Sequence, residues 1–84
     1  MRKYIVAYDL RKQGQNYTGL IQALKEFPSV HPMQSTWFIK TNLTASEIRG
    51  HLKQFIDQND SIFVGEISSS WAAQMSQEAL DFLK

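Results

Sequence analysis

The order of apolar segments along the chain limits its fold more than any other feature of the sequence. Runs of β-forming residues occur four times, at residues 4–8, 30–34, 37–41 and 61–67. Apolar residues recur at helical spacing over residues 17–27 and 48–56, and again after Trp71. The predicted order is therefore strand, helix, strand, strand, helix, strand and a short final helix.

In a chain of 84 residues, this order predicts one domain with a split βαβ, or ferredoxin-like, arrangement. We expect an α+β sandwich over residues 1–84, with a four-stranded antiparallel sheet, both helices on one face and a helical tail over residues 67–84. Right-handed crossovers, and the uniformly apolar first and last strands, favour central positions for these two strands. Pro32 restricts the second strand to an edge or a bulge.

Local signals place the ends of the two long helices. Pro28 cannot continue the first helix and ends it, and Asn16 is a plausible cap at its start. Thr44 and Glu47 form the pattern of a capping box. In this motif the Thr44 hydroxyl accepts from the Glu47 amide, and the Glu47 carboxylate accepts from the Thr44 amide. We expect this capping box to have a structural role.

The second face of the sheet has no long helix to cover it in this pattern. A domain of this size buries only roughly 60% of the surface that its unfolded chain exposes. Either the helical tail or a second subunit must therefore cover the apolar residues on this face. We predict a homodimer on these grounds.

Composition excludes several classes of protein. The chain has no cysteine, which excludes disulfides, cysteine nucleophiles and thiolate metal sites. No apolar run approaches the roughly 20 residues of a membrane span, and the apolar run at the N-terminus is too short for a signal peptide. We therefore expect a cytoplasmic protein with no membrane association.

Charge is unevenly distributed along the sequence. Residues 1–42 contain six Lys or Arg and two Asp or Glu, whereas residues 43–84 contain three and six. Such a division gives either one face that attracts polyanions or an ordinary mixed surface, and the sequence leaves both interpretations open.

Asp9 is the first candidate for a functional residue. It ends the first strand, where the chain turns into a polar loop. A single carboxylate can bind Mg²⁺ when phosphates, waters or a second carboxylate complete the coordination shell. In a two-fold dimer joined through the sheets, the second carboxylate would be Asp9 of the other copy. The alternative is that Asp9 only stabilises the turn.

The loop after Asp9 contains the candidate nucleic-acid contacts. Arg11 and Lys12 could hold a phosphate backbone beside a metal-binding carboxylate, or could form a solvated loop. Tyr8 and Tyr17 flank this loop and could stack on bases, although aromatic residues at such positions are more often packed in the core or at its rim.

Several short motifs, in the same order and spacing, resemble a known family. They are Tyr4–Asp9, Gly14–Tyr17, Gln34–Phe38, Ser35–Thr41 and Trp71–Ala72. Together they resemble the SinR-like branch of the CRISPR-associated Cas-two proteins, which are small ferredoxin-like endonucleases, over nearly the whole chain.

The resemblance implies a homodimer in which Asp9 lies at the dimer cleft and binds a divalent metal, with magnesium the expected cofactor. By position, Tyr8, Asp9 and Phe38 correspond to the family's catalytic residues. The implied activity is Mg²⁺-dependent hydrolysis of RNA or DNA. Arginines that the family has at two places are absent here, where Asn16, Tyr17, Pro32 and Met33 stand instead.

A non-catalytic role is the alternative. The missing arginines and the small net charge of +1 favour a dimeric interaction module. Its partner would be a toxin–antitoxin component or a CRISPR integrase. The helical tail differs from the crossing C-terminal strand of many Cas-two proteins, so no docking strand for an integrase is evident.

Overall fold

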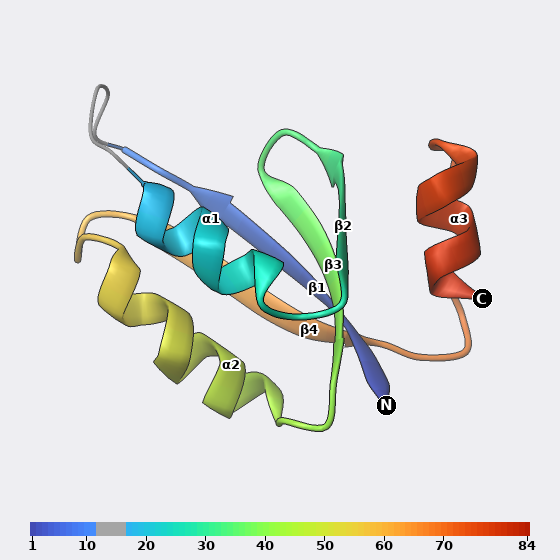
Figure 1. Ribbon diagram of the computed structural model, residues 1–84, viewed down its shortest axis with the longest axis horizontal. Coiled ribbons are helices and arrows are strands. Elements are labelled where there is room, and N and C mark those ends of the chain that lie inside the picture. The colour runs from blue at the N-terminus through green and yellow to red at the C-terminus, as the bar shows by residue number, and fades with distance from the viewer. Residues whose placement is uncertain (12–16) are drawn as a thin grey trace.

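A computed structural model of the protein describes residues 1–11 and 17–84 and confirms the predicted order of elements. Figure 1 shows their arrangement along the chain. The elements are β1 (Arg2–Asp9), α1 (Thr18–Lys25), β2 (Ser29–Met33), β3 (Thr36–Thr41), α2 (Ala45–Leu52), the short 3₁₀ helix η1 (Lys53–Phe55), β4 (Ser61–Ile67) and α3 (Gln77–Leu83). The expected cap Asn16 lies outside the described residues.

The four strands form one antiparallel sheet in the order β2-β3-β1-β4, which makes the fold α+β and ferredoxin-like. The prediction that the last strand is central was wrong. The interior strands are β1 and β3, and β4 pairs with β1 at the edge. The reason lies in the two crossovers, β1-α1-β2 and β3-α2-β4, each of which leaves room for one strand between the two strands that it joins. Strand β3 lies between β1 and β2, and β1 lies between β3 and β4, so β1 and β3 are the interior strands. An apolar composition therefore did not decide which strand is interior.

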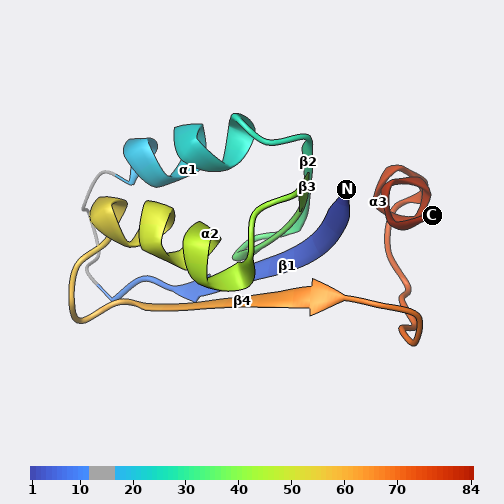
Figure 2. The same cartoon turned by 90° about the horizontal axis from the view of Figure 1, so that it is seen from below.

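The main core lies between the sheet and the helices α1 and α2, which cover the same face of the sheet (Figure 2). Tyr4 and Val6 project from β1 toward the helices and are at most 2% exposed. Strand β3 supplies Trp37 and Ile39, and the helices supply the other buried side chains of this core, which are Leu20, Ala23, Leu24, Ile48 and Leu52. The hydroxyl of Tyr4 donates to the carbonyl of Leu43 at 2.6 Å, which leaves no unpaired polar atom at this position.

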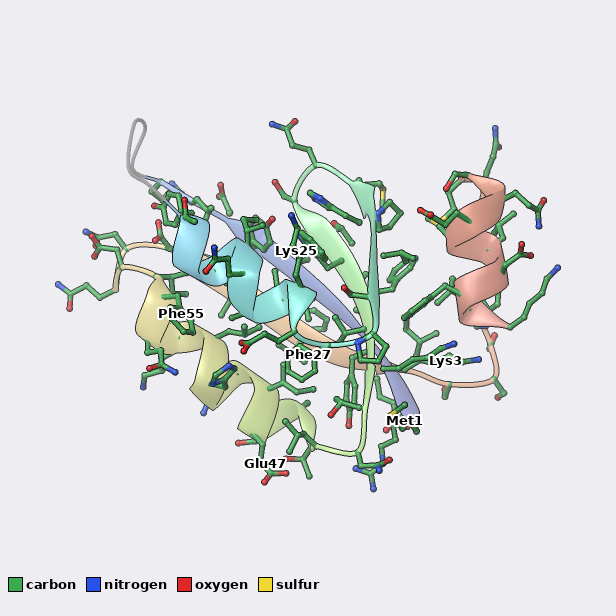
Figure 3. All side chains as sticks on the ribbon, in the orientation of Figure 1. Met1, Lys3, Lys25, Phe27, Glu47 and Phe55 are labelled. Atoms are coloured by element: carbon green, nitrogen blue, oxygen red, sulfur yellow. The ribbon has the colours of Figure 1, made fainter. Side chains whose placement is uncertain are left out.

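Helix α2 begins with the predicted capping box. The Thr44 hydroxyl accepts from the Glu47 amide at 3.2 Å, and the Glu47 carboxylate accepts from the Thr44 amide at 2.9 Å. Figure 3 shows Glu47 at this end of the helix. The capping box satisfies two amides that the helix itself leaves without partners.

The tail is less helical than predicted. Strand β4 extends to Ile67, residues 68–76 form no helix or strand, and α3 begins only at Gln77. The helix begins there because the Ser76 hydroxyl caps it by accepting from the Ala79 amide at 3.3 Å. No helix within the described residues is long and apolar enough to cross a membrane.

Helix α3 covers part of the second face of the sheet. Ala79 and Leu83 are buried against Phe38 of β3. The Lys3 ammonium on β1 donates to the Leu83 carbonyl at 2.5 Å and to the Lys84 carbonyl at 3.1 Å. Figure 3 shows the Lys3 side chain extending toward the C-terminal end of α3. The Lys40 ammonium lies 4.3 Å from the centre of the Phe82 ring. The tail helix is therefore docked on the β2–β3 side of this face, and the β4 side stays open.

Candidate functional site at the end of strand β1

Asp9 lies on the open face of the sheet. It is the last residue of β1 and pairs with Ser61 of β4. Because side chains alternate along a strand, Asp9 and Ala7 project away from the face that carries Tyr4 and Val6. The Asp9 side chain is 65% exposed, so its carboxylate is accessible to an ion or to a second chain.

A shallow hollow of about 300 Å³ adjoins Asp9. Its lining residues are Ala7, Tyr8, Asp9, Ser61, Ile62 and Phe63. Phe63 is 62% exposed, and its ring lies over Gly65, where an added Cβ would be only 2.8 Å from the ring. An exposed aromatic ring beside an accessible carboxylate gives this face both apolar surface and negative charge.

Arg11 pairs with Asp9. Its Nε lies 3.1 Å from Asp9 Oδ2, and the two side chains are 66% and 65% exposed. Exposed pairs of this kind contribute little to stability and separate readily. Lys12, the other predicted phosphate contact, lies outside the described residues.

Asp60, which is not among the candidate residues expected from the sequence, organises the loops around the site. One carboxylate oxygen accepts from the Arg11 amide at 2.8 Å, and the other accepts from the Asp57 amide at 2.8 Å. The Tyr17 hydroxyl donates to the same carboxylate at 3.1 Å. An Asp directly before a strand is the sequence signal for such a turn, but its long-range partners depend on the fold.

Tyr8 lines the same hollow as Asp9, but neither the Tyr8 hydroxyl nor Phe38 is placed with the Asp9 carboxylate. The Tyr8 hydroxyl accepts from Trp37 Nε1 at 3.0 Å, so Tyr8 belongs to the packing around Trp37. Phe38 is 4% exposed beneath α3 and pairs with Ile5. Asp9 is four residues further along β1, which is about 13 Å in an extended strand. Of the three candidates taken from the resemblance, only Asp9 has an accessible functional group on the open face.

The metal-binding capacity of one chain is small. Within residues 1–11 and 17–84, no group of three or more His, Cys, Asp or Glu is placed to hold a metal ion. Asp9 supplies one hard oxygen ligand of the type that Mg²⁺ prefers, and the other ligands must come from water, a phosphate or a second chain.

Comparison with known proteins supports the fold. No protein-family model matches the sequence. A solved structure, described as a hypothetical protein TT1823 from Thermus thermophilus, is similar to this chain with a TM-score of 0.66 and 16% sequence identity. The match covers 89% of this chain and 94% of that one. At this identity the similarity establishes a shared fold and leaves function to be argued from the site.

Proposed function

We propose that the protein is a homodimer that binds nucleic acid, in which the Asp9 residues of two copies meet across the open sheet faces and hold Mg²⁺. The observation that supports this proposal best is the position of Asp9. Its side chain is 65% exposed on the part of the sheet that α3 leaves open. A second copy on this face would bring a second carboxylate to the first.

The open face also has the surface that a dimer needs. Phe63 is 62% exposed, and Ala7, its pairing partner on β1, is small enough to allow close approach of another sheet. Burial of Phe63 in the dimer would remove apolar surface from water. A stable interface should bury about 1,000 Å² or more in total.

Two carboxylates, with waters and phosphate oxygens, form a ligand set that suits Mg²⁺. The bound metal would polarise a phosphate and lower the pKa of a coordinated water. The chain's own residues would position the substrate. Arg11, displaced from Asp9, would pair with the phosphate backbone, with Lys12 as a second contact. The proposed activity is hydrolysis of RNA or DNA.

The test is the variant Asp9→Asn, which keeps the shape of the side chain and removes its charge. We expect Mg²⁺ to raise the melting temperature of the parent and to support cleavage of an RNA or DNA substrate, and we expect both effects to be lost in the variant. Glu26→Gln is the matched control, because Glu26 is an exposed carboxylate at the end of α1. A monomer in sedimentation, with no response to Mg²⁺, would refute the proposal.

The second candidate function is a non-catalytic dimeric module that binds a protein partner, such as a toxin–antitoxin or CRISPR component. The Arg11–Asp9 ion pair favours it, because Arg11 already neutralises the charge of the Asp9 carboxylate. In that case Asp9→Asn leaves the melting temperature in Mg²⁺ unchanged. Replacement of Phe63 by Gln would still dissociate the dimer, and sedimentation measures this directly.

A further inference from the structure

Two lysines lie directly opposite one another on adjacent strands beneath helix α3. Lys3 of β1 pairs with Lys40 of β3 in the sheet, so their side chains project from the same face. Both residues are half-buried. Like charges that are directly opposite on a sheet destabilise it. Positions where a sequence breaks such a rule are where functional sites are expected.

Helix α3 supplies the partners of these two cations, but it supplies no full negative charge. The Lys3 ammonium donates to the Leu83 and Lys84 carbonyls, and the Lys40 ammonium lies over the Phe82 ring. Neither lysine makes an ion pair with an Asp or Glu among the described residues. Carbonyl dipoles and an aromatic ring offer only partial charges. A phosphate group, which is fully charged, would therefore bind the two ammonium groups more strongly than α3 does.

An aromatic side chain lies beside the two lysines on the same face. Phe38 is two residues from Lys40 on β3, so it projects to the same side of the sheet, and it pairs with Ile5 of β1. Phe38 is 4% exposed, and Ala79 and Leu83 of α3 are buried against it. Departure of α3 would therefore uncover an aromatic ring on an interior strand, next to two cations.

A ring and two cations on the face of a four-stranded sheet suit single-stranded nucleic acid. Unpaired bases stack on aromatic side chains that project from such sheets, and lysines bind the phosphates. Stacking accepts any base, since every base has an aromatic face. A duplex does not offer such a base, because its bases are stacked on one another. An acidic peptide would pair with the lysines, but its carboxylates supply no flat ring to stack on Phe38.

The connection of α3 to the rest of the chain allows its displacement. The helix has seven residues, and residues 68–76, which join it to β4, form no helix or strand. Within residues 1–11 and 17–84, no backbone hydrogen bond outside the helices and strands involves residues 68–75. The side chains that α3 contacts are also separate from the main core. The helix can therefore leave the sheet while the rest of the domain stays folded.

We propose that α3 covers a binding surface for single-stranded nucleic acid, composed of Lys3, Phe38 and Lys40, and that nucleic acid and α3 compete for it. In the complex a base stacks on Phe38, and the adjoining phosphates pair with the two ammonium groups. Helix α3 is then an intramolecular inhibitor, because only molecules with α3 undocked can bind. This inference rests on the proposed function for the class of ligand alone. The surface includes neither Asp9 nor Phe63.

The test measures binding of a fluorescein-labelled oligothymidylate octamer by fluorescence anisotropy, in EDTA so that Mg²⁺ makes no contribution. Leu83→Ala removes the apolar contact that holds α3 over Phe38. We expect this variant to bind at least about tenfold more tightly than the parent, because more molecules have the surface uncovered. Glu78→Ala, at an exposed position of α3, and Thr44→Ala, at the cap of α2, are the controls. Both should keep the affinity of the parent.

The surface residues are tested in the Leu83→Ala background. Lys3→Gln with Lys40→Gln should weaken binding about tenfold and remove the salt dependence, which for two phosphate contacts on a single strand is a slope of about −1.4 in log K against log salt concentration. Phe38→Leu keeps an apolar side chain and should weaken binding at least about fivefold through the loss of stacking. Lys25→Gln is the control, since Lys25 is an exposed cation on α1 (Figure 3). Binding should be unchanged in this variant.

Hydrogen exchange in the parent tests the competition without any substitution. Saturating oligonucleotide should remove protection from the amides of residues 77–83, while the amides of β1 and β3 keep theirs. A ligand bound elsewhere on the molecule would leave the protection of α3 unchanged. If Leu83→Ala unfolds as a whole, this measurement decides the question.

Four results would overturn the proposal. They are unchanged protection of α3 in the parent at saturation, a folded Leu83→Ala variant that binds no more tightly than the parent, equal effects of Lys25→Gln and of the Lys3→Gln, Lys40→Gln pair, and tighter binding of polyglutamate than of the oligonucleotide. The last result would assign the surface to an acidic protein. Asp9→Asn should alter none of these measurements, so this surface and the proposed function can fail independently.

Discussion

Leu83 is the residue on which the docking of α3 depends most. Helix α3 has seven residues, and isolated helices of that length are unstable in water. Its position therefore depends on contacts with the sheet. Leu83 is 3% exposed and Ala79 is 1% exposed, both against Phe38. The Leu83→Ala substitution removes most of the apolar side-chain contact at this end of the helix.

The expected loss can be compared with the contacts that remain. Replacement of a buried Leu by Ala costs about 2–5 kcal/mol. Lys3 at the C-terminal carbonyls contributes about 0.3–1 kcal/mol, and Lys40 over Phe82 contributes about 0.5–1 kcal/mol. The loss exceeds these two contributions, and the apolar contacts that remain come from the small side chain of Ala79 and the partly buried Met75 and Phe82, so α3 should undock. The core between the sheet and helices α1 and α2 uses a separate set of side chains and should stay folded.

Hydrogen exchange with mass spectrometry measures this difference by segment. In Leu83→Ala, amides of residues 77–83 should lose protection while those of α1 and β1 keep it, and the dye ANS should bind the uncovered surface around Phe38. Glu78→Ala is the control, because Glu78 is exposed on the same helix. Unchanged protection of α3, or unfolding of the whole chain in one transition, would refute the reasoning that α3 docks as a separate unit.

Three further predictions concern hydrogen bonds that hold helix and loop ends. Thr44→Ala should cost about 0.5–2 kcal/mol and lower the melting temperature by about 3–11 °C for a chain of this length, without a change in any nucleic-acid binding of the kind proposed. Hydrogen bonds from Thr44 lower the pKa of Glu47. The ionised carboxylate therefore stabilises the fold at pH values above its ordinary pKa, and this contribution is lost as the pH falls through the lowered pKa. Urea titrations should show that the difference in unfolding free energy between the parent and Glu47→Gln becomes smaller in acid. Tyr17→Phe removes a donor to Asp60 and should cost about 0.5–1.5 kcal/mol in the same titrations.

The candidate site could be predicted only in part. Asp9 follows an apolar strand and precedes a polar loop, and that position is visible in the sequence. Its partners are not, because the Arg11 side chain turns back to Asp9 and the Asp60 carboxylate contacts the Arg11 amide from a distant segment. The bond between Tyr8 and Trp37 joins residues on two strands, so it too depends on the sheet.

Local physics in the sequence determined the type and order of the elements. Hydrophobic spacing specified helices and strands, Pro28 ended α1, and Thr44 with Glu47 began α2. These signals act within a few residues, so they can be read without knowledge of the fold.

Tertiary structure decided which strand is interior and what each face of the sheet contacts. The interleaving of two βα units placed β3, and not β4, beside β1 on its inner side. It also left α3 over Phe38 and left Phe63 exposed on the same sheet face. Apolar composition indicates that a strand will be covered, but only the arrangement of all the elements determines whether the chain itself or a partner supplies the cover.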